Sequence, residues 1–220
     1  MNTALVEDHL MFRDVLRAVC AQELGHRIVG EADDGLRAVD MLLAAKPDLL
    51  LLDLRLPSLD GLDVLARVRP ALPKLRTIVL SSRCDRFTLL SVERAQVQGF
   101  VDKNTNTFAT LKEAVMAVRS GRTWFSAEYQ RERAARLADS ESFEKILRDR
   151  ECEALAIIGA PHTIPEAARR LGISAAGVEK QRARLLQKLG LETTAELVRY
   201  AQENGFTRSS SSGDGGRLQP

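Results

Sequence analysis

Short apolar runs recur along the first half of this chain, and a polar residue follows each of them. The runs occupy residues 4–6, 49–52, 78–80 and 100–101. Continuous apolar runs of this length are typical of strands that are buried on both faces. Longer amphipathic stretches with helical periodicity separate them. This alternation predicts an α/β domain built on a doubly wound parallel sheet.

The polar residues after these runs form a candidate site, and they are Glu7, Asp8, Asp53, Ser81 and Lys103. Because the carboxyl ends of parallel strands meet at one edge of a sheet, we expect these side chains to converge in one crevice. Clustered carboxylates repel one another unless a cation joins them, and Mg2+ prefers a few carboxylate oxygens together with several waters. A lysine and a hydroxyl group can hold phosphoryl oxygens. The set therefore predicts phosphoryl transfer to a carboxylate nucleophile.

Asp53 is the best candidate for that nucleophile. It follows the most hydrophobic run and is therefore expected at the centre of the sheet. Each residue of the set, taken alone, is better explained as an ordinary polar group at the end of a strand. The interpretation depends on all of them occurring in this order and at this spacing.

Residues 1–123 resemble the receiver domain of bacterial response regulators, which implies a flavodoxin-like fold with a five-stranded parallel sheet. The motifs that carry the resemblance lie at residues 5–9, 53–61, 79–82 and 99–103. By this resemblance, Asp53 is the phosphoacceptor and the cofactor is Mg2+.

The resemblance also implies roles for the other residues of the site. Asp8 binds the metal directly and Glu7 binds it through water, while the backbone carbonyl of Arg55 completes the metal site. Ser81 matches the switch hydroxyl and Lys103 matches the lysine that binds the phosphoryl group. Phe100 matches the aromatic switch residue.

The second half of the chain contains a compact run of helical segments. A capping box at 163–166 begins a short helix that Gly172 ends, and Ser174 begins the next helix. Residues 174–189 hold four basic residues and one acidic residue, a net charge of 4 − 1 = +3. Two helices joined by a short turn, the second of them basic, predict a helix-turn-helix that binds double-stranded DNA. A small structural four-helix bundle is the alternative on these features alone.

Residues 147–206 resemble the LuxR-type helix-turn-helix that ends response regulators of the NarL/FixJ class. The matching segments are 147–151, 166–174, 185–191 and 195–198. Five residues of the basic helix are then predicted to lie at the DNA: Glu179, Lys180, Arg182, Arg184 and Lys188.

Within this helix, the residues nearest its start are expected to read bases, and the later cations are expected to contact phosphates. The last helix offers Leu197, Val198 and Ala201 as a dimer face, so that a dimer reads two half-sites.

This module departs from the family pattern, which has threonine, valine and lysine and then histidine two positions later where this chain has Gly177, Val178, Glu179 and Gln181. Gly177 lies within the basic helix, and Pro161 stands where the family tends to have glycine. Glu179 replaces a cation at a position expected to face DNA. This carboxylate either accepts a hydrogen bond from a cytosine amino group or repels phosphate. The departures predict an unusual target sequence.

These features together predict a transcriptional regulator of a two-component system, phosphorylated by a sensor histidine kinase and acting as a homodimer. The alternative is a regulator whose C-terminal module binds a protein partner in place of DNA. The basic helix favours the first interpretation. We expect no enzymatic activity beyond promotion of the receiver's own phosphorylation and dephosphorylation.

The remaining segments are less informative. Residues 124–146 are interpreted as a linker with a short helix, and residues 207–220, rich in serine and glycine, as a disordered tail. No apolar stretch is long enough to span a membrane, and the N-terminus lacks the basic region of a signal peptide. Three scattered cysteines are expected to be reduced thiols of a cytoplasmic protein, and Cys84, near the crevice, a passive one.

Overall fold

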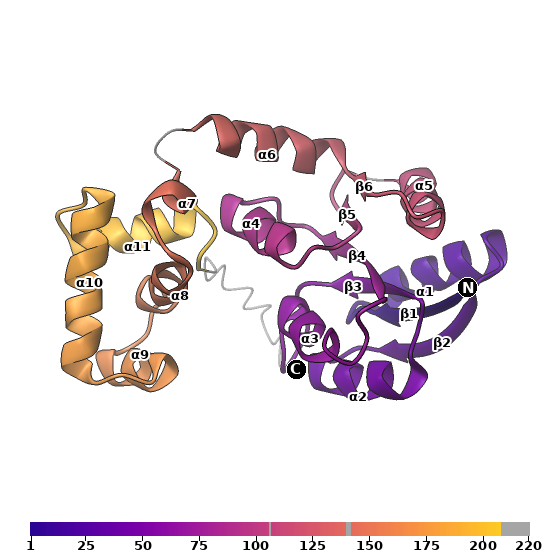
Figure 1. The fold of residues 1–220 in the computed structure, drawn as a ribbon, viewed down its shortest axis with the longest axis horizontal. Coiled ribbons are helices and arrows are strands. Elements are labelled where there is room, and N and C mark those ends of the chain that lie inside the picture. Colours follow the sequence, from indigo (N-terminus) through magenta and orange to yellow (C-terminus); the bar gives the residue numbers. More distant parts are fainter. Residues whose placement is uncertain (106, 140–141, 208–220) are drawn as a thin grey trace, which may run out of the picture. The chain divides into compact units, whose positions relative to one another are not determined.

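A computed structural model of the chain describes residues 1–105, 107–139 and 142–207 (Figure 1). The chain divides into two compact units between Ala135 and Arg136, which is inside the predicted linker. All of the predicted tail except Thr207 lies outside the described residues.

The first unit is built on a parallel sheet with strand order β2-β1-β3-β4-β5-β6. Its strands are β1 (Asn2–Val6), β2 (Arg27–Ala32), β3 (Leu49–Asp53), β4 (Arg76–Ser81), β5 (Gly99–Asp102) and β6 (Trp124–Phe125). Every residue of β3 is buried, as expected for an inner strand between two others. The doubly wound α/β fold is therefore confirmed.

Helices cover both faces of the sheet (Figure 1). Side chains alternate between the faces along each strand. In β3, Leu49 and Leu51 join the core on one face, whereas Leu50 and Leu52 join the core on the other. The first face carries α1 (Leu10–Arg17), the π-helical segment η1 (Ala18–Glu23) and α5 (Phe108–Arg119), and the second carries α2 (Gly35–Ala45), α3 (Gly61–Val68) and α4 (Arg86–Arg94).

The predicted number of five strands is wrong by one, because β6 adds a sixth. The amide of Trp124 donates to the carbonyl of Gln98 at 3.0 Å, and the amide of Ser126 donates to the carbonyl of Phe100 at 3.0 Å. A two-residue strand is too short to produce an apolar run. It forms because the exposed edge of β5 offers unpaired backbone groups.

Helix α6 (Ala127–Ala138) follows β6 and continues across the division between the units. Near its start, the side chain of Tyr129 is buried in the core beside α2, α3 and α4. The segment predicted as a linker therefore contributes a strand and a core residue to the first unit.

The second unit consists of short helices. They are α7 (Phe143–Ile146), α8 (Asp149–Ile158), α9 (Ile164–Leu171), α10 (Ala175–Leu189) and α11 (Thr194–Glu203). Gly172 ends α9 with a left-handed backbone at φ 64°, and the Ser174 hydroxyl caps α10 by accepting from the amide of Gly177. Ala167 and Val178 share a small core between the two helices. The predicted helix-turn-helix is thus formed by α9 and α10.

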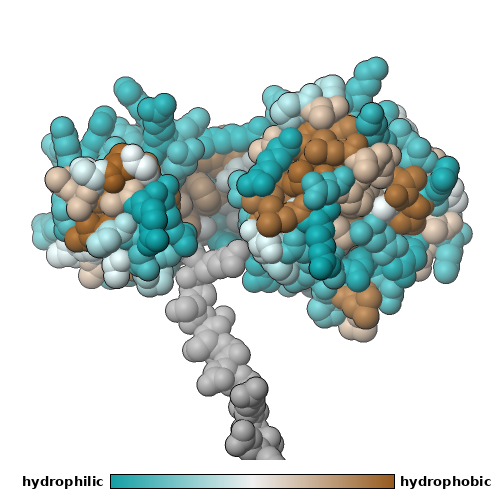
Figure 2. Space-filling view, turned by 90° about the horizontal axis from the view of Figure 1, so that it is seen from below, coloured by the Kyte–Doolittle hydropathy of each residue, from teal (hydrophilic) through white to brown (hydrophobic). Residues whose placement is uncertain are grey.

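The surface is mixed in character. Figure 2 shows hydrophobic residues interspersed among hydrophilic ones on the first unit, seen from the side of α2. Leu36 and Leu43 of that helix are exposed. Among the helices of the described residues, none combines the length and the apolar character needed to cross a membrane.

Candidate functional site

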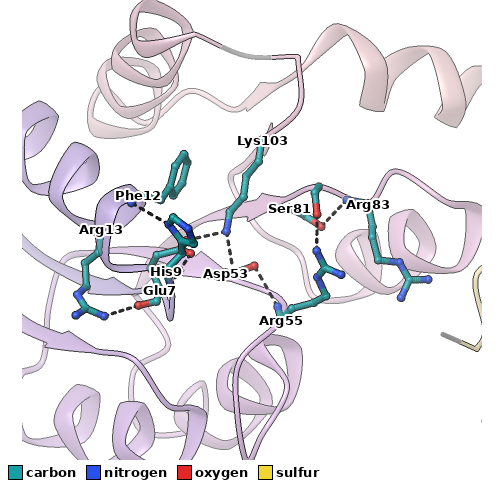
Figure 3. Close-up of polar contacts among 10 residues, drawn as sticks. Glu7, His9, Phe12, Arg13, Asp53, Arg55, Ser81, Arg83 and Lys103 are labelled. Carbon is teal, nitrogen blue, oxygen red and sulfur yellow. Dashed lines mark hydrogen bonds and ion pairs between the residues drawn. The ribbon is translucent and has the colours of Figure 1, made fainter. Parts of the chain in front are cut away.

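Three charged side chains meet at the carboxyl edge of the sheet (Figure 3). Glu7 directly follows β1, Asp53 is the last residue of β3, and Lys103 directly follows β5. The Lys103 ammonium lies 2.7 Å from Glu7 Oε2 and 2.7 Å from Asp53 Oδ2. These residues line a pocket of about 410 Å3 together with Asp8, His9, Phe12, Arg55 and Ser82.

The acidic residues of this pocket form a cluster that suits a hard cation. One carboxylate oxygen from each of Glu7, Asp8 and Asp53 lies within 4.8 Å of the others. Three carboxylates and the two cations Lys103 and Arg55 leave the pocket with a formal charge of −3 + 2 = −1. Asp8 is exposed, which leaves room for the waters that Mg2+ retains. The donor set therefore fits Mg2+.

Glu7 is the most buried of these carboxylates, with none of its side-chain surface exposed. Burial raises the pKa of Glu7, and the nearby Asp53 carboxylate adds to this, whereas the hydrogen bond from Lys103 opposes it. The His9 amide donates to Glu7 Oε1 at 3.3 Å, and Arg13 donates to its carbonyl oxygen at 2.7 Å. These contacts hold Glu7 in place at the end of β1.

Phe12 is a pocket residue that sequence reasoning missed. The Lys103 ammonium lies 4.8 Å from the centroid of the Phe12 ring, a cation–π distance. Figure 3 shows the Phe12 ring beside the side chain of Lys103. The sequence gave no sign of this contact, because Phe12 lies in an amphipathic helix and helical periodicity is equally consistent with a place in the core.

Of the remaining predicted residues, Arg55 lines the pocket, whereas Ser81 is not among the residues that line it. The Ser81 hydroxyl accepts from the amide of Arg83 at 3.0 Å. The Arg55 amide donates to Asp53 Oδ1 at 3.1 Å, while its guanidinium donates to Ser82 Oγ at 2.9 Å. Ser82 and the Arg55 side chain therefore border the pocket, although sequence reasoning gave neither of them a role.

The loop after Asp53 depends on a glycine. An ideal Cβ on Gly61 would lie 2.1 Å from the backbone oxygen of Asp53, so no other residue fits without moving the backbone there. The amide of Gly61 donates to the carbonyl of Leu54 at 2.9 Å. The start of α3 is thereby held against the end of β3.

Two predicted residues near the pocket are covered by other side chains. Phe100 is fully buried and packs against Tyr129 of α6. Cys84 is half-buried, and burial followed by nearby carboxylates raises the pKa of its thiol to about 12. A thiol that stays protonated at neutral pH is a poor nucleophile, which favours a passive role.

The second candidate site is the exposed face of α10. Lys180 is exposed, and the guanidinium of Arg182 contacts the Glu179 carboxylate one turn away. Two further cations share a partner that sequence reasoning missed, the buried Glu151 of α8. Lys188 Nζ lies 2.8 Å from its Oε2, and Arg184 Nε lies 3.1 Å from its Oε1.

Glu151 is thereby kept charged inside the unit. Burial alone would raise its pKa, but the Arg148 amide, Lys188 and Arg184 outweigh burial, and the pKa of Glu151 is lowered. Arg184 and Lys188 hence have an intramolecular role beside the predicted one at phosphates.

The predicted dimer face on α11 is wrong for two of its three residues. Leu197 and Ala201 are fully buried within the unit. The packing is tight, because an ideal Cβ on Gly159 at the end of α8 would lie 2.4 Å from the Ala201 Cβ. The apolar stripe of α11 serves the core of its own unit and is not free to face a second chain.

A doubly wound sheet with an acidic pocket at its carboxyl edge, followed by a helix-turn-helix, is the architecture of a two-domain regulator. Residues 3–116 match the family model of the response regulator receiver domain. The chain belongs to the response regulators, in the NarL/FixJ class.

Two known regulators match nearly the whole chain. The transcriptional regulatory protein MctR of Rhizobium johnstonii is 30% identical over 210 residues, which cover 94% of this chain and 95% of that protein. The oxygen regulatory protein NreC of Staphylococcus aureus is 28% identical over 210 residues, covering 91% and 96%.

Solved structures share the fold. RcsB of Salmonella enterica serovar Typhimurium, solved on a promoter with the phosphomimetic BeF3-, aligns with a TM-score of 0.65 at 24% identity and covers 92% of this chain and 98% of its own. A two-component response regulator of the LuxR family from Aurantimonas aligns with a TM-score of 0.58 at 25% identity, covering 63% of this chain and 98% of its own.

Proposed function

We propose that this protein is a phosphorylation-controlled DNA-binding transcriptional regulator of a two-component system, and that Asp53 accepts the phosphoryl group from a sensor histidine kinase. The observation that carries this proposal is the position of Asp53. Its carboxylate ends the central buried strand, 2.7 Å from the Lys103 ammonium and beside two further carboxylates. The protein acts in the cytoplasm, where its DNA target lies.

The transfer follows from the chemistry of these groups. An oxygen of Asp53 attacks the phosphorus of a phosphohistidine. A P–O bond forms while the P–N bond breaks, and the leaving imidazole keeps the electron pair and takes up a proton. Lys103, already held between Glu7 and Asp53, pairs with the new phosphoryl oxygens and offsets their charge.

Mg2+ fits the same pocket. Asp8 and Asp53 would hold it, with Glu7 acting through water and the Arg55 carbonyl completing the set. When bound, the ion neutralises negative charge on the transferring group. The protein's own contribution is to keep three carboxylates within reach of one another despite their mutual repulsion.

The proposed switch uses Ser81 and Phe100. The Ser81 hydroxyl accepts from the Arg83 amide and, after phosphorylation, donates its own hydrogen to a phosphoryl oxygen. Its movement frees space for Phe100, whose ring is packed on Tyr129 at the beginning of α6. The phosphorylated protein then dimerises and binds DNA through α10. The names of MctR and NreC, both regulators, and the promoter in the RcsB structure support this output.

The test compares Asp53→Asn with Asp14→Asn, a conservative change at an exposed carboxylate on α1 outside the pocket. Acetyl phosphate and Mg2+ are expected to label wild type and Asp14→Asn, and to leave Asp53→Asn unlabelled because an amide is a poor nucleophile. Full labelling of Asp53→Asn would move the acceptor elsewhere. Enrichment of a DNA motif from a random pool by the labelled wild type tests the output, and its failure favours a protein partner.

A further inference from the structure

Glu179 lies early in α10, at the fifth residue of the helix. Its carboxylate is in contact with the guanidinium of Arg182, one turn further along. The two side chains are 42% and 30% exposed, so the pair lies on the surface of the unit and faces solvent. Lys180, directly after Glu179, is exposed as well.

This pair is not needed to form the helix. Ser174 caps the first turn, Gly190 ends the last, and Val178 and Leu185 are buried beneath it. Exposed ion pairs three residues apart add little to helix stability. The helix therefore does not depend on this pair for its stability.

The pairing with Arg182 reduces the electrostatic cost of placing the Glu179 carboxylate close to DNA. A bare carboxylate in the major groove is repelled by the phosphates on both sides. Arg184 and Lys188 form ion pairs with Glu151. Among the described residues, the cation that pairs with Glu179 is Arg182. The guanidinium offsets the carboxylate charge and restricts the directions in which its oxygens point.

We propose that Glu179 is a specificity-determining residue that accepts a hydrogen bond from the N4 amino group of cytosine, and that Arg182 is its positioning residue. An ionised carboxylate has acceptors alone and so requires a donor on the base edge. In the major groove, cytosine presents that donor without an adjacent acceptor on the same base. Residues near the start of a recognition helix are those that reach base edges. The inference rests on the proposed function, since it requires that α10 enters DNA.

The experiment uses the full chain, phosphorylated with acetyl phosphate. Wild type is selected on a random DNA pool, and its best site is then remade with each other base at every position. We expect one position in each half-site to require cytosine, with about ten-fold weaker binding for any replacement. Glu179→Gln keeps the size of the side chain but adds a donor. It is expected to lose this preference while binding the remaining positions as before.

Arg182→Gln separates positioning from a phosphate contact. If Arg182 positions Glu179, this variant loses the cytosine preference, as Glu179→Gln does. A uniform fall in affinity for all sequences, with the preference intact, would make Arg182 a phosphate contact and overturn its positioning role. Arg199→Gln removes the same charge from α11 and serves as the matched control, for which the preference is unchanged. Circular dichroism confirms that each variant keeps its helices.

The outcomes for the inference and the proposed function are distinct. A wild type that enriches no sequence contradicts the proposed function. If wild type and Glu179→Gln enrich the same motif and lose the same affinity at each base replacement, Glu179 does not recognise cytosine. DNA binding by the protein would still stand.

Discussion

The rings of Phe100 and Tyr129 are in contact, with their centroids 5.1 Å apart and their planes at 41°. Phe125 also stacks on Tyr129, with the ring centroids 4.7 Å apart. Phe100 lies on β5, the strand that Lys103 directly follows. Tyr129 lies on α6, the helix that continues across the division between the two units. This contact leads us to expect that a movement of Phe100 on phosphorylation would also move α6.

Replacement of Tyr129 tests this coupling. Tyr129→Leu is expected to reduce the increase in DNA affinity that phosphorylation produces, because the aromatic contact with Phe100 is lost. Labelling at Asp53 should persist, since Tyr129 does not line the pocket. DNA binding with and without acetyl phosphate measures the effect. Tyr129→Phe, which keeps the ring, is the control, and equal coupling in both variants would disprove the route.

Removal of Asp8 tests the metal site. Asp8→Ala is expected to weaken Mg2+ binding by about ten-fold or more, because a hard oxygen ligand is lost. Phosphorylation by acetyl phosphate should fall with it. Calorimetric titration measures the affinity, and Asp14→Ala controls for the loss of a carboxylate nearby. Unchanged Mg2+ affinity in Asp8→Ala would place the ion elsewhere.

The contact of Lys188 with Glu151 predicts an effect on stability before any on DNA. Lys188→Met leaves the buried carboxylate short of a charged partner and is expected to cost about 1–3 kcal/mol of the free energy of unfolding. Urea unfolding followed by circular dichroism, which reports helix content, measures this loss of stability. The lone tryptophan, Trp124, lies in the first unit, so its fluorescence transition should not move. If Lys188→Met were as stable as wild type but bound DNA more weakly, Lys188 would act as a phosphate contact and not as a stabilising partner of Glu151.

His26 predicts how the stability of the first unit depends on pH. Burial lowers the pKa of His26 from its ordinary value of 6.5, and the N-terminal amino group and Arg119 lower it further. Nδ1 lies 3.0 Å from the Thr3 hydroxyl, and Nε2 has no hydrogen-bond partner among the described residues. The charged form therefore has no acceptor at Nε2 to stabilise it there.

The direction follows from proton linkage. Below pH 6.5 the unfolded chain protonates His26 first, so the free energy of unfolding falls as the pH drops from 6.5 to the lowered pKa. Above 6.5 the contribution of His26 is constant. Urea unfolding followed by Trp124 fluorescence, at several pH values between 5 and 8, is the measurement. His26→Gln should lack this part of the pH dependence, and an identical profile in both proteins refutes the assignment.

The sequence by itself determined the four strands that its apolar runs mark, β1, β3, β4 and β5, and the charged residues that end or follow three of them and line the pocket. Asp53 and Lys103 each lie at the end of a strand signal, and the carboxyl ends of parallel strands must share an edge. Ser174 and Gly172 marked the ends of helices through local hydrogen bonding and backbone conformation. These features are readable because they depend on neighbours within a few residues.

Only the tertiary structure decided which side chains meet across long separations. Lys103 and Glu7 are 96 residues apart, and Lys188 and Glu151 are 37 apart. Helical period showed that Leu197 and Ala201 share a stripe, but not whether the stripe packs inside its own unit or against a second chain. Strand β6 likewise depends on an edge provided by β5. Such contacts depend on how whole elements pack, because a local pattern specifies which face is apolar and not what covers it.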